Sequence, residues 1–226
     1  MGYILSDIYN KLHFGRHAPV AHERIWLDPR KIRCAIPDPC EIGLAKNDPN
    51  FDLHESSWKW AKSSVGRVIP NDSYNPALVP LMSICKINAC LRHWSDGVSW
   101  EESGAINNLL FKIKQPDRAQ RNCVNRSDVI SRYQKLDEIY AAVRRNGYVS
   151  SSLRRGRLIK RERDGIEVHL GYDGVPIFGD SGTHRLAMAL ALKFEIIPAA
   201  LGFVHETALH QLPKLRCHPL QSTFPK

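Results

Sequence analysis

The 226-residue sequence predicts an α+β fold, in which a helical, proline-interrupted N-terminal half packs on a C-terminal domain of strands and helices. Three observations predict this class. An alternating apolar run is followed by the turn dipeptide Asp173-Gly174, which is typical of a β-hairpin. A strand, a glycine-containing turn and a helix start come next. Apolar residues also recur at helical spacing in three long segments: residues 4–12, 77–94 and 127–145.

The N-terminal third is expected to hold little regular structure. Residues 1–20 predict one short packing helix, and residues 24–28 predict a short extended piece. Six prolines fall between residues 28 and 76, so helices and strands should be sparse there. Trp58 and Trp60 lie in that stretch and are expected to cover the core rather than to stack on a ligand.

Three further helices are predicted before the hairpin. The first spans residues 77–94 after Pro76. Ser99 and Glu102 have the spacing of a capping box and predict a second helix that runs to about residue 114. The basic residues near its end, Lys112 among them, are expected to form a solvated connector. Ser127 is expected to cap the third helix, which runs to residue 145 before Gly147.

A strongly basic segment follows the third helix. Residues 154–163 hold six basic side chains in ten positions. Two interpretations stay open: a solvated loop, or a clamp on phosphates or nucleic acid. The residues of this basic clamp are Arg154, Arg155, Arg157, Lys160, Arg161 and Arg163.

The predicted C-terminal domain begins with the hairpin of residues 166–171 and 175–178. His169 alternates onto the face of the first strand that is expected to be wet. Residues 196–203 predict the next strand, and His205 follows it at a place from which it could face a site. Glu167, His169 and His205 are therefore accessory site candidates, and the chain beyond Leu212 is expected to be loosely ordered.

The loop of residues 179–185, Gly-Asp-Ser-Gly-Thr-His-Arg, is the main functional candidate. It lies between a predicted strand and a predicted helix, where unpaired backbone N–H groups and the helix dipole favour anions. Gly182 allows close approach of a ligand, and Arg185 offers a planar fork for phosphate oxygens. The expected phosphate-binding residues are Ser181, Gly182, Thr183, His184 and Arg185. Capping and solvation of the helix is the alternative role for His184 and Arg185.

The sequence Asp180–Ala187, with Ile196–Ala200 after it, resembles the core of the ParB/sulfiredoxin superfamily. The resemblance covers residues 126–210 and implies a nucleotide-binding domain at 126–212, after a mostly helical or irregular region at 1–125 and before a tail at 213–226. The segments 23–29 and 96–102 also resemble the front half of uncharacterised ParB-like bacterial and archaeal proteins, and this second resemblance implies no function.

The superfamily implies several activities. Sulfiredoxin-like chemistry needs a cysteine where this chain has Thr183, which argues against a thiolate mechanism. Partition proteins bind CTP and read DNA with a later domain, for which too few residues remain. Free-serine kinases of this superfamily use a similar turn, and this resemblance implies Asp180 as the catalytic or Mg²⁺-binding carboxylate beside a catalytic His184. Those kinases place Asp where this chain has Ser181.

Composition and charge agree with an acidic ligand. The net charge is +9, which favours nucleotides, nucleic acid or phosphorylated metabolites. Cysteine spacing indicates free thiols and a cytoplasmic location, although Cys34–Cys40 and Cys85–Cys90 bridges stay open. The sequence shows no transmembrane run, so no membrane partner is expected.

The leading hypothesis is a nucleotide-binding phosphotransferase that uses ATP or ADP with Mg²⁺, or alternatively CTP, and acts on a small hydroxyl compound. A DNA-binding or nuclease-type ParB-like protein is the alternative, and an inactive scaffold is the third.

Overall fold

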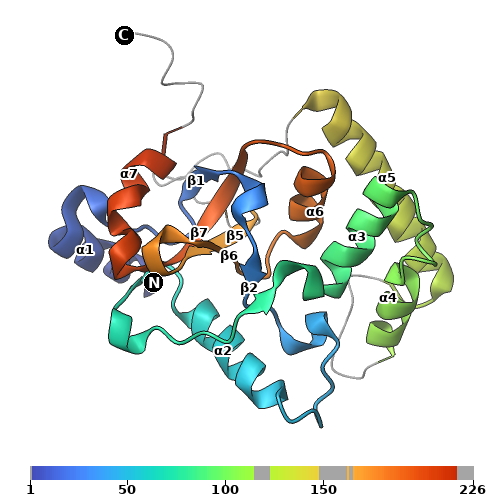
Figure 1. Ribbon diagram of the computed structural model, residues 1–226, viewed down its shortest axis with the longest axis horizontal. Helices are drawn as coiled ribbons and strands as arrows, with labels where there is room; N and C mark the ends of the chain where they lie inside the picture. The colour runs from blue at the N-terminus through green and yellow to red at the C-terminus, as the bar shows by residue number, and fades with distance from the viewer. Residues whose placement is uncertain (1, 115–122, 148–161, 163–164, 218–226) are drawn as a thin grey trace.

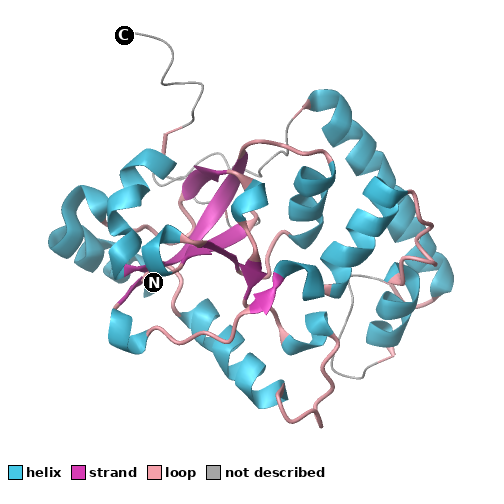
Figure 2. Ribbon diagram, viewed as in Figure 1, coloured by secondary structure: helices cyan, strands magenta, loops and turns pink. Residues whose placement is uncertain are grey.

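The computed structural model describes residues 2–114, 123–147, 162 and 165–217, and within them helices surround one mixed β-sheet (Figure 1, Figure 2). This architecture confirms the predicted α+β class. The seven strands are β1 (Arg24–Leu27), β2 (Cys34–Ala35), β3 (Val68–Ile69), β4 (Val79–Pro80), β5 (Glu167–Leu170), β6 (Pro176–Phe178) and β7 (Ile197–His205). The helices of the described residues are α1 (Gly2–Phe14), α2 (Phe51–Ser63), α3 (Cys85–Asp96), α4 (Ala105–Ile113), α5 (Arg126–Asn146), α6 (Thr183–Ala191) and α7 (Leu212–Leu215).

Strand β7 organises the sheet, whose order is β1-β7-β5-β6-β2-β4. The first half of β7 pairs antiparallel with β1, its last residues pair parallel with β3, and β5 runs parallel along its other side. Strands β1–β4 come from residues 24–80, whereas β5–β7 come from residues 167–205. A single sheet therefore joins the two parts of the chain that the sequence divides after residue 125.

Both faces of the sheet are covered. Phe178 of β6 packs in a core cluster with Ile87 of α3 and Leu186 of α6. Its neighbour Ile177 points to the other face, where it packs with Ala61 of α2. Helices α3 and α6 thus cover one face and α2 the other, in agreement with Figure 1. None of the helices within the described residues has the length and hydropathy of a membrane span.

One carboxylate ties α5 to α3. The two oxygens of Asp137 on α5 accept hydrogen bonds from the indole N–H groups of Trp94 and Trp100, each at 2.9 Å. Nε2 of His93 on α3 lies 3.2 Å from the same carboxylate. Hydrogen bonds to a charged acceptor are stronger than neutral ones, so this cluster fixes the outer helix on the inner one.

The predictions for the first 76 residues are partly confirmed. The expected N-terminal helix is α1, and the extended piece at 24–28 is β1. The expectation of sparse structure between residues 28 and 76 is wrong over α2. That helix lies between Pro49 and Pro70 and contains neither proline nor glycine, so the prolines bound it without interrupting it.

The start of α3 also differs from the prediction. A helix was expected from residue 77, but α3 begins at Cys85. Residues 79–80 instead pair with β2, and residues 81–83 form a 3₁₀ turn. The helical spacing of the apolar residues favours a helix here, but pairing with β2 decides the structure of residues 79–80. Such pairing is a tertiary interaction that local spacing does not reveal.

For two helices, the residue that caps the N-terminus differs from the one that the sequence predicts. Ser99 and Glu102 do bond each other's backbone, but α4 begins only after Gly104, whose φ is +85°. For α5, Asn125 rather than Ser127 is the N-cap, and it forms the capping box with Asp128. The α5 helix ends at Gly147 as predicted, because that residue adopts the left-handed conformation.

The predicted hairpin is confirmed as β5 and β6. Asp173 and Gly174 have φ values of 50° and 78°, so both central turn residues adopt the left-handed conformation that such a turn requires. The predicted strand at 196–203 is β7, which continues to His205. All six cysteines are free, as expected from their spacing.

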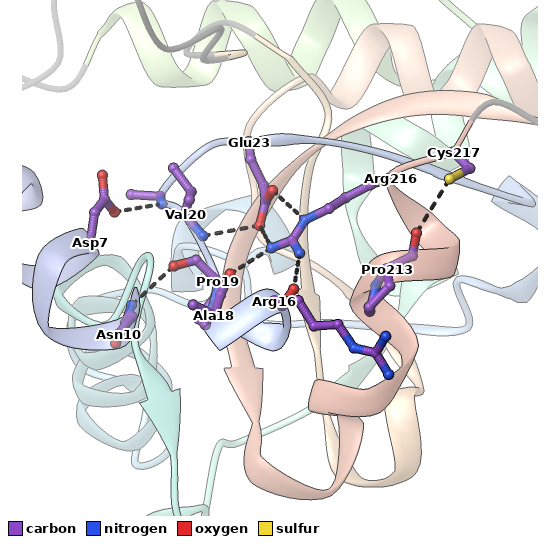
Figure 3. Close-up of polar contacts among 11 residues, drawn as sticks. Asp7, Asn10, Arg16, Ala18, Pro19, Val20, Glu23, Pro213, Arg216 and Cys217 are labelled. Atoms are coloured by element: carbon purple, nitrogen blue, oxygen red, sulfur yellow. Dashed lines mark hydrogen bonds and ion pairs between the residues drawn. The ribbon is translucent and has the colours of Figure 1, made fainter. Parts of the chain in front are cut away.

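Residues 218–226 of the predicted loose tail lie outside the described residues. The first part of that tail, residues 213–217, is ordered, contrary to the expectation. Arg216 holds it in place (Figure 3). The guanidinium donates to both carboxylate oxygens of Glu23 at 2.8 Å and to the backbone oxygens of Arg16 and Ala18. This bidentate ion pair fastens α7 to the segment between α1 and β1.

Candidate functional site

The loop between β6 and α6 is folded back on the start of β5. The backbone N–H of Glu167 donates to the oxygen of Ser181 at 3.0 Å, and that of Gly179 donates to the oxygen of Glu167 at 2.9 Å. Asp180 and Gly182 have φ values of +82° and +81°. A non-glycine residue with such a φ carries backbone strain, which is often found at functional sites.

The predicted phosphate-binding residues lie together at one pocket. Residues 180–185 form one wall of a cavity of about 1130 Å³, and α3, α4 and α5 supply the others. These helices and α6 lie on the same side of the molecule in Figure 1. The first helical hydrogen bond of α6 runs from Leu186 N to Gly182 O, so the N–H groups of residues 183–185 precede the helical ladder. The positive end of α6 therefore faces the pocket.

A charge triad, of which Glu41 and Lys112 are buried, also lines this pocket. Glu41 Oε1 lies 2.8 Å from Lys86 Nζ and 2.9 Å from Lys112 Nζ. Lys112 is only 4% exposed. Its Nζ forms an ion pair with Glu41, although the geometry of that contact does not meet the criteria for a hydrogen bond. The two lysines lower the pKa of Glu41 against the effect of its burial. The triad thus carries a net charge of +1, in a low-dielectric wall of the cavity.

Asp180 is the carboxylate of the loop. Its pKa is raised to about 6, mainly by burial and also by the charge of Glu41, while Lys62 and Lys86 oppose the shift. Trp58 Nε1 donates to Asp180 Oδ2 at 3.2 Å. Trp58 packs against the core cluster that includes Ala61 and Phe203, as expected, and its indole in addition fixes the orientation of a site carboxylate. Trp60 does cover the core, against Phe203.

No family model, curated protein or solved structure matches this chain. The resemblance of its loop to the ParB/sulfiredoxin superfamily therefore stays a prediction from the sequence. The chemistry of the pocket is derived from its own side chains.

The accessory candidates do not line the pocket. Glu167 lies behind the loop on β5, where burial raises its pKa to about 7, and the charge of Asp180 adds to that shift. His205 is fully buried at the end of β7, and its Nδ1 lies 2.9 Å from the Thr207 hydroxyl. Neither side chain is placed to contact a ligand in this cavity.

His169 was expected on a wet face of its strand, and that expectation is wrong. The side chain is fully buried and stacks on Phe203, with ring centroids 4.2 Å apart. Its Nδ1 accepts the N–H of Phe203, and burial lowers the pKa of the ring to about 3, so it is neutral. Alternating polar and apolar residues predict a solvent-exposed strand face only where one face of the sheet is open to water. Strand β5 lies between β7 and β6, and both of its faces are covered.

The raised pKa of Glu167 predicts a pH-dependent effect of its replacement. A carboxyl with a folded pKa of about 7 stabilises the fold below pH 4.5, and this contribution is lost as the pH rises to 7. Glu167→Gln removes the titration. We compare the free energy of unfolding of the variant with that of the wild type at each pH. The difference, variant minus wild type, should be about 3 kcal/mol larger at pH 8 than at pH 4.5. Urea unfolding at both pH values measures this difference, and an equal difference at the two values would contradict it.

Other predicted features lie outside the pocket or outside the described part of the chain. Five of the basic-clamp residues fall within residues 148–161, and Arg163 within 163–164, so all six lie outside the described residues. In the segments that are described, no three His, Cys, Asp or Glu side chains gather as they would around a metal ion. Cys85 and Cys123 line the cavity, although no cysteine lies in the loop itself.

Proposed function

We propose that this protein binds a nucleotide, or a closely related phosphate ester, in the pocket between the 180–185 loop and helices α3, α4 and α5. The proposal rests mainly on one observation: the N-terminus of α6 and the buried Lys112 line the same cavity. Lys86 and Arg185 line the same space. Such an arrangement of preorganised N–H groups and cations suits the oxygens of phosphate.

The charge balance of the lining supports an anionic ligand. Five lysine and arginine side chains border the cavity against three carboxylates, which leaves a net charge of +2 with the histidine neutral. The basic residues are Lys86, Lys112, Arg132, Lys135 and Arg185, and the acidic ones are Glu41, Asp128 and Asp180. The electrostatic attraction between an anion and these cations is stronger in the cavity than in water, because the surrounding protein screens charges weakly.

Part of the cavity lining is apolar. Tyr133 and Leu136 of α5 line it with Met188 of α6. Tyr133 is buried, and its hydroxyl donates to Ala105 O at 3.2 Å. A cavity lined by both cations and apolar side chains suits a ligand of mixed character, such as a nucleoside phosphate.

Phosphoryl transfer to a small hydroxyl compound is the reaction that we propose for this site. Asp180 would accept the proton of the attacking hydroxyl while the phosphoryl group leaves the nucleotide, and Lys112 and Arg185 would balance the charge of its oxygens. A pKa of about 6 leaves Asp180 ionised at neutral pH yet basic enough to take a proton. In this proposal His184 supports the phosphate end beside Arg185.

A Mg²⁺ ion that accompanies the nucleotide would be compatible with this lining. Such ions are held largely by the phosphates and need only one or two carboxylates from the protein. Glu41 is engaged by two lysines, so Asp180 is the carboxylate that fits this role, as the alternative to its role as proton acceptor. The ion would supply neutralisation of phosphate charge.

Calorimetric titration with ATP, ADP and CTP, with and without Mg²⁺, tests the proposal. We expect at least one nucleotide to bind, and Arg185→Ala to weaken that binding about tenfold or more, since a charge-assisted hydrogen bond contributes about 1.5–3 kcal/mol. Asp180→Asn should keep binding and lose transfer. Lys59→Ala is the matched control, because Lys59 pairs with Glu55 on α2 away from the cavity.

A DNA duplex titrated in parallel separates the alternative function. Duplex binding that weakens steeply with salt and survives Arg185→Ala, without any nucleotide binding, would overturn the proposal and favour a DNA-binding protein.

A further inference from the structure

Helix α1 docks on the rest of the molecule through polar side chains (Figure 3). The buried amide of Asn10 donates to the backbone oxygens of Pro19 at 3.0 Å and of Gly66 at 2.7 Å. Asp7 Oδ1 accepts the N–H of Ala21 at 3.3 Å. The inward face of α1 is therefore fixed by hydrogen bonds.

Four apolar side chains of α1 point away from the molecule. Leu5 is 72% exposed, Ile8 54%, Tyr9 58% and Leu12 79%. Their spacing of three and four residues places them on one helix face. A surface helix normally turns such a stripe toward the core, so the polarity of α1 is the reverse of the usual one. A contiguous apolar face of this kind marks an interaction surface, unlike single exposed apolar residues.

The stripe is complementary to itself. Positions 5, 8, 9 and 12 are symmetric about the point between Ile8 and Tyr9. In an antiparallel pair related by a two-fold axis, Leu5 of one chain lies opposite Leu12 of the other, and Ile8 lies opposite Tyr9. An isologous interface requires this reciprocity. We propose that α1 is an interface at which two copies of this chain form a dimer.

Charge agrees with this pairing. Lys11 borders the stripe, and the same symmetry places it opposite Ser6 of the second copy, so no like charges lie directly opposite each other. The acidic residue of the described helix, Asp7, is engaged on the inward face. Asn10 and Asp7 also hold the helix in position before association, which reduces the entropy lost on binding.

The size of the helix sets the expected strength. Thirteen residues extend about 20 Å. A helix pair of this length buries less than the ~800 Å² per partner of a standard interface, so the dimer should be weak and depend on concentration. Helix α1 lies at the opposite end of the molecule from α4 and α5 in Figure 1, so dimerisation would leave the pocket open. The inference is thus independent of the proposed function.

Sedimentation equilibrium over a range of concentrations tests this inference. We expect the wild type to approach twice the mass of the 25.7 kDa chain at high concentration. Leu5→Lys and Leu12→Glu should each weaken the dimer tenfold or more. The double variant Leu5→Lys/Leu12→Glu should recover much of the association, because opposite charges then face each other across the two-fold axis. Leu53→Lys on α2 is the control, since Leu53 is 61% exposed away from α1, and it should change nothing.

Several results would overturn the inference. One is a wild type that stays monomeric at every concentration; if it also sediments with anionic lipid vesicles, the face belongs to a lipid surface. A monomer that Leu12→Glu destabilises would assign the face to another segment of the same chain. A dimer that both single variants leave intact would place the interface elsewhere.

Discussion

Replacing Glu41 with alanine is expected to lower the free energy of unfolding by about 3–5 kcal/mol, because removal of one partner from a buried ion pair leaves a charge without compensation. The uncompensated charge would be that of Lys112, which is almost fully buried on α4. Lys86 is more exposed and can be solvated more easily. Urea or thermal unfolding of the variant measures the loss.

The matched control is Glu55→Ala on α2. Glu55 also pairs with a lysine, Lys59, at 3.0 Å, but its side chain is 35% exposed and that of Lys59 63%, so water solvates the pair and the loss should be below about 1 kcal/mol. The double variant Glu41→Ala/Lys112→Met should recover part of the lost stability, because it removes the buried charge together with its partner. Equal losses for the two single variants would show that the triad is solvated and not buried.

Replacing Gly182 with alanine is expected to cost about 2–4 kcal/mol and to abolish ligand binding. An added Cβ would lie 2.7 Å from Gly165 O and from Ile166 Cα, which are backbone atoms that cannot turn aside. The φ of +81° adds a further cost of about 1–2 kcal/mol for an L-residue. Unfolding and nucleotide titration of the same variant separate the loss of stability from the loss of binding.

Gly97→Ala isolates the backbone contribution. Gly97 ends α3 with φ +74°, nearly the same as Gly182, but an added Cβ there meets no atom within 4 Å. We expect a loss of about 1 kcal/mol and unchanged ligand binding. A Gly182→Ala variant that lost no more stability than Gly97→Ala would mean that the loop moves readily away from β5.

The loop could be predicted from the sequence because its determinants are local. A strand, a glycine and a helix start within about ten residues define where an anion can approach backbone N–H groups. The hairpin before it was predictable for the same reason, since Asp173-Gly174 fixes the turn. The start of α3 was not, because residues 79–80 form a strand only when β2 lies beside them.

The charge triad of the pocket could not be predicted because its members are distant in the sequence. Glu41 and Lys112 meet only after α4 packs near the 3₁₀ turn of residues 39–42. One signal was present: Lys112 lies three residues after Leu109, on the apolar face of α4. A lysine on the buried face of a helix needs a partner, and that requirement could have argued against a solvated connector.

The position of β7 in the chain has a consequence for how the protein folds. Strands β1 and β3 complete their pairing only when residues 197–205 have been synthesised, and β5 runs beside the same strand. Until then the N-terminal half that has emerged from the ribosome contains strands that lack their neighbour. Such long sequence separations slow folding and leave strand edges open to aggregation. We therefore expect the nascent chain to be most prone to aggregation before β7 emerges.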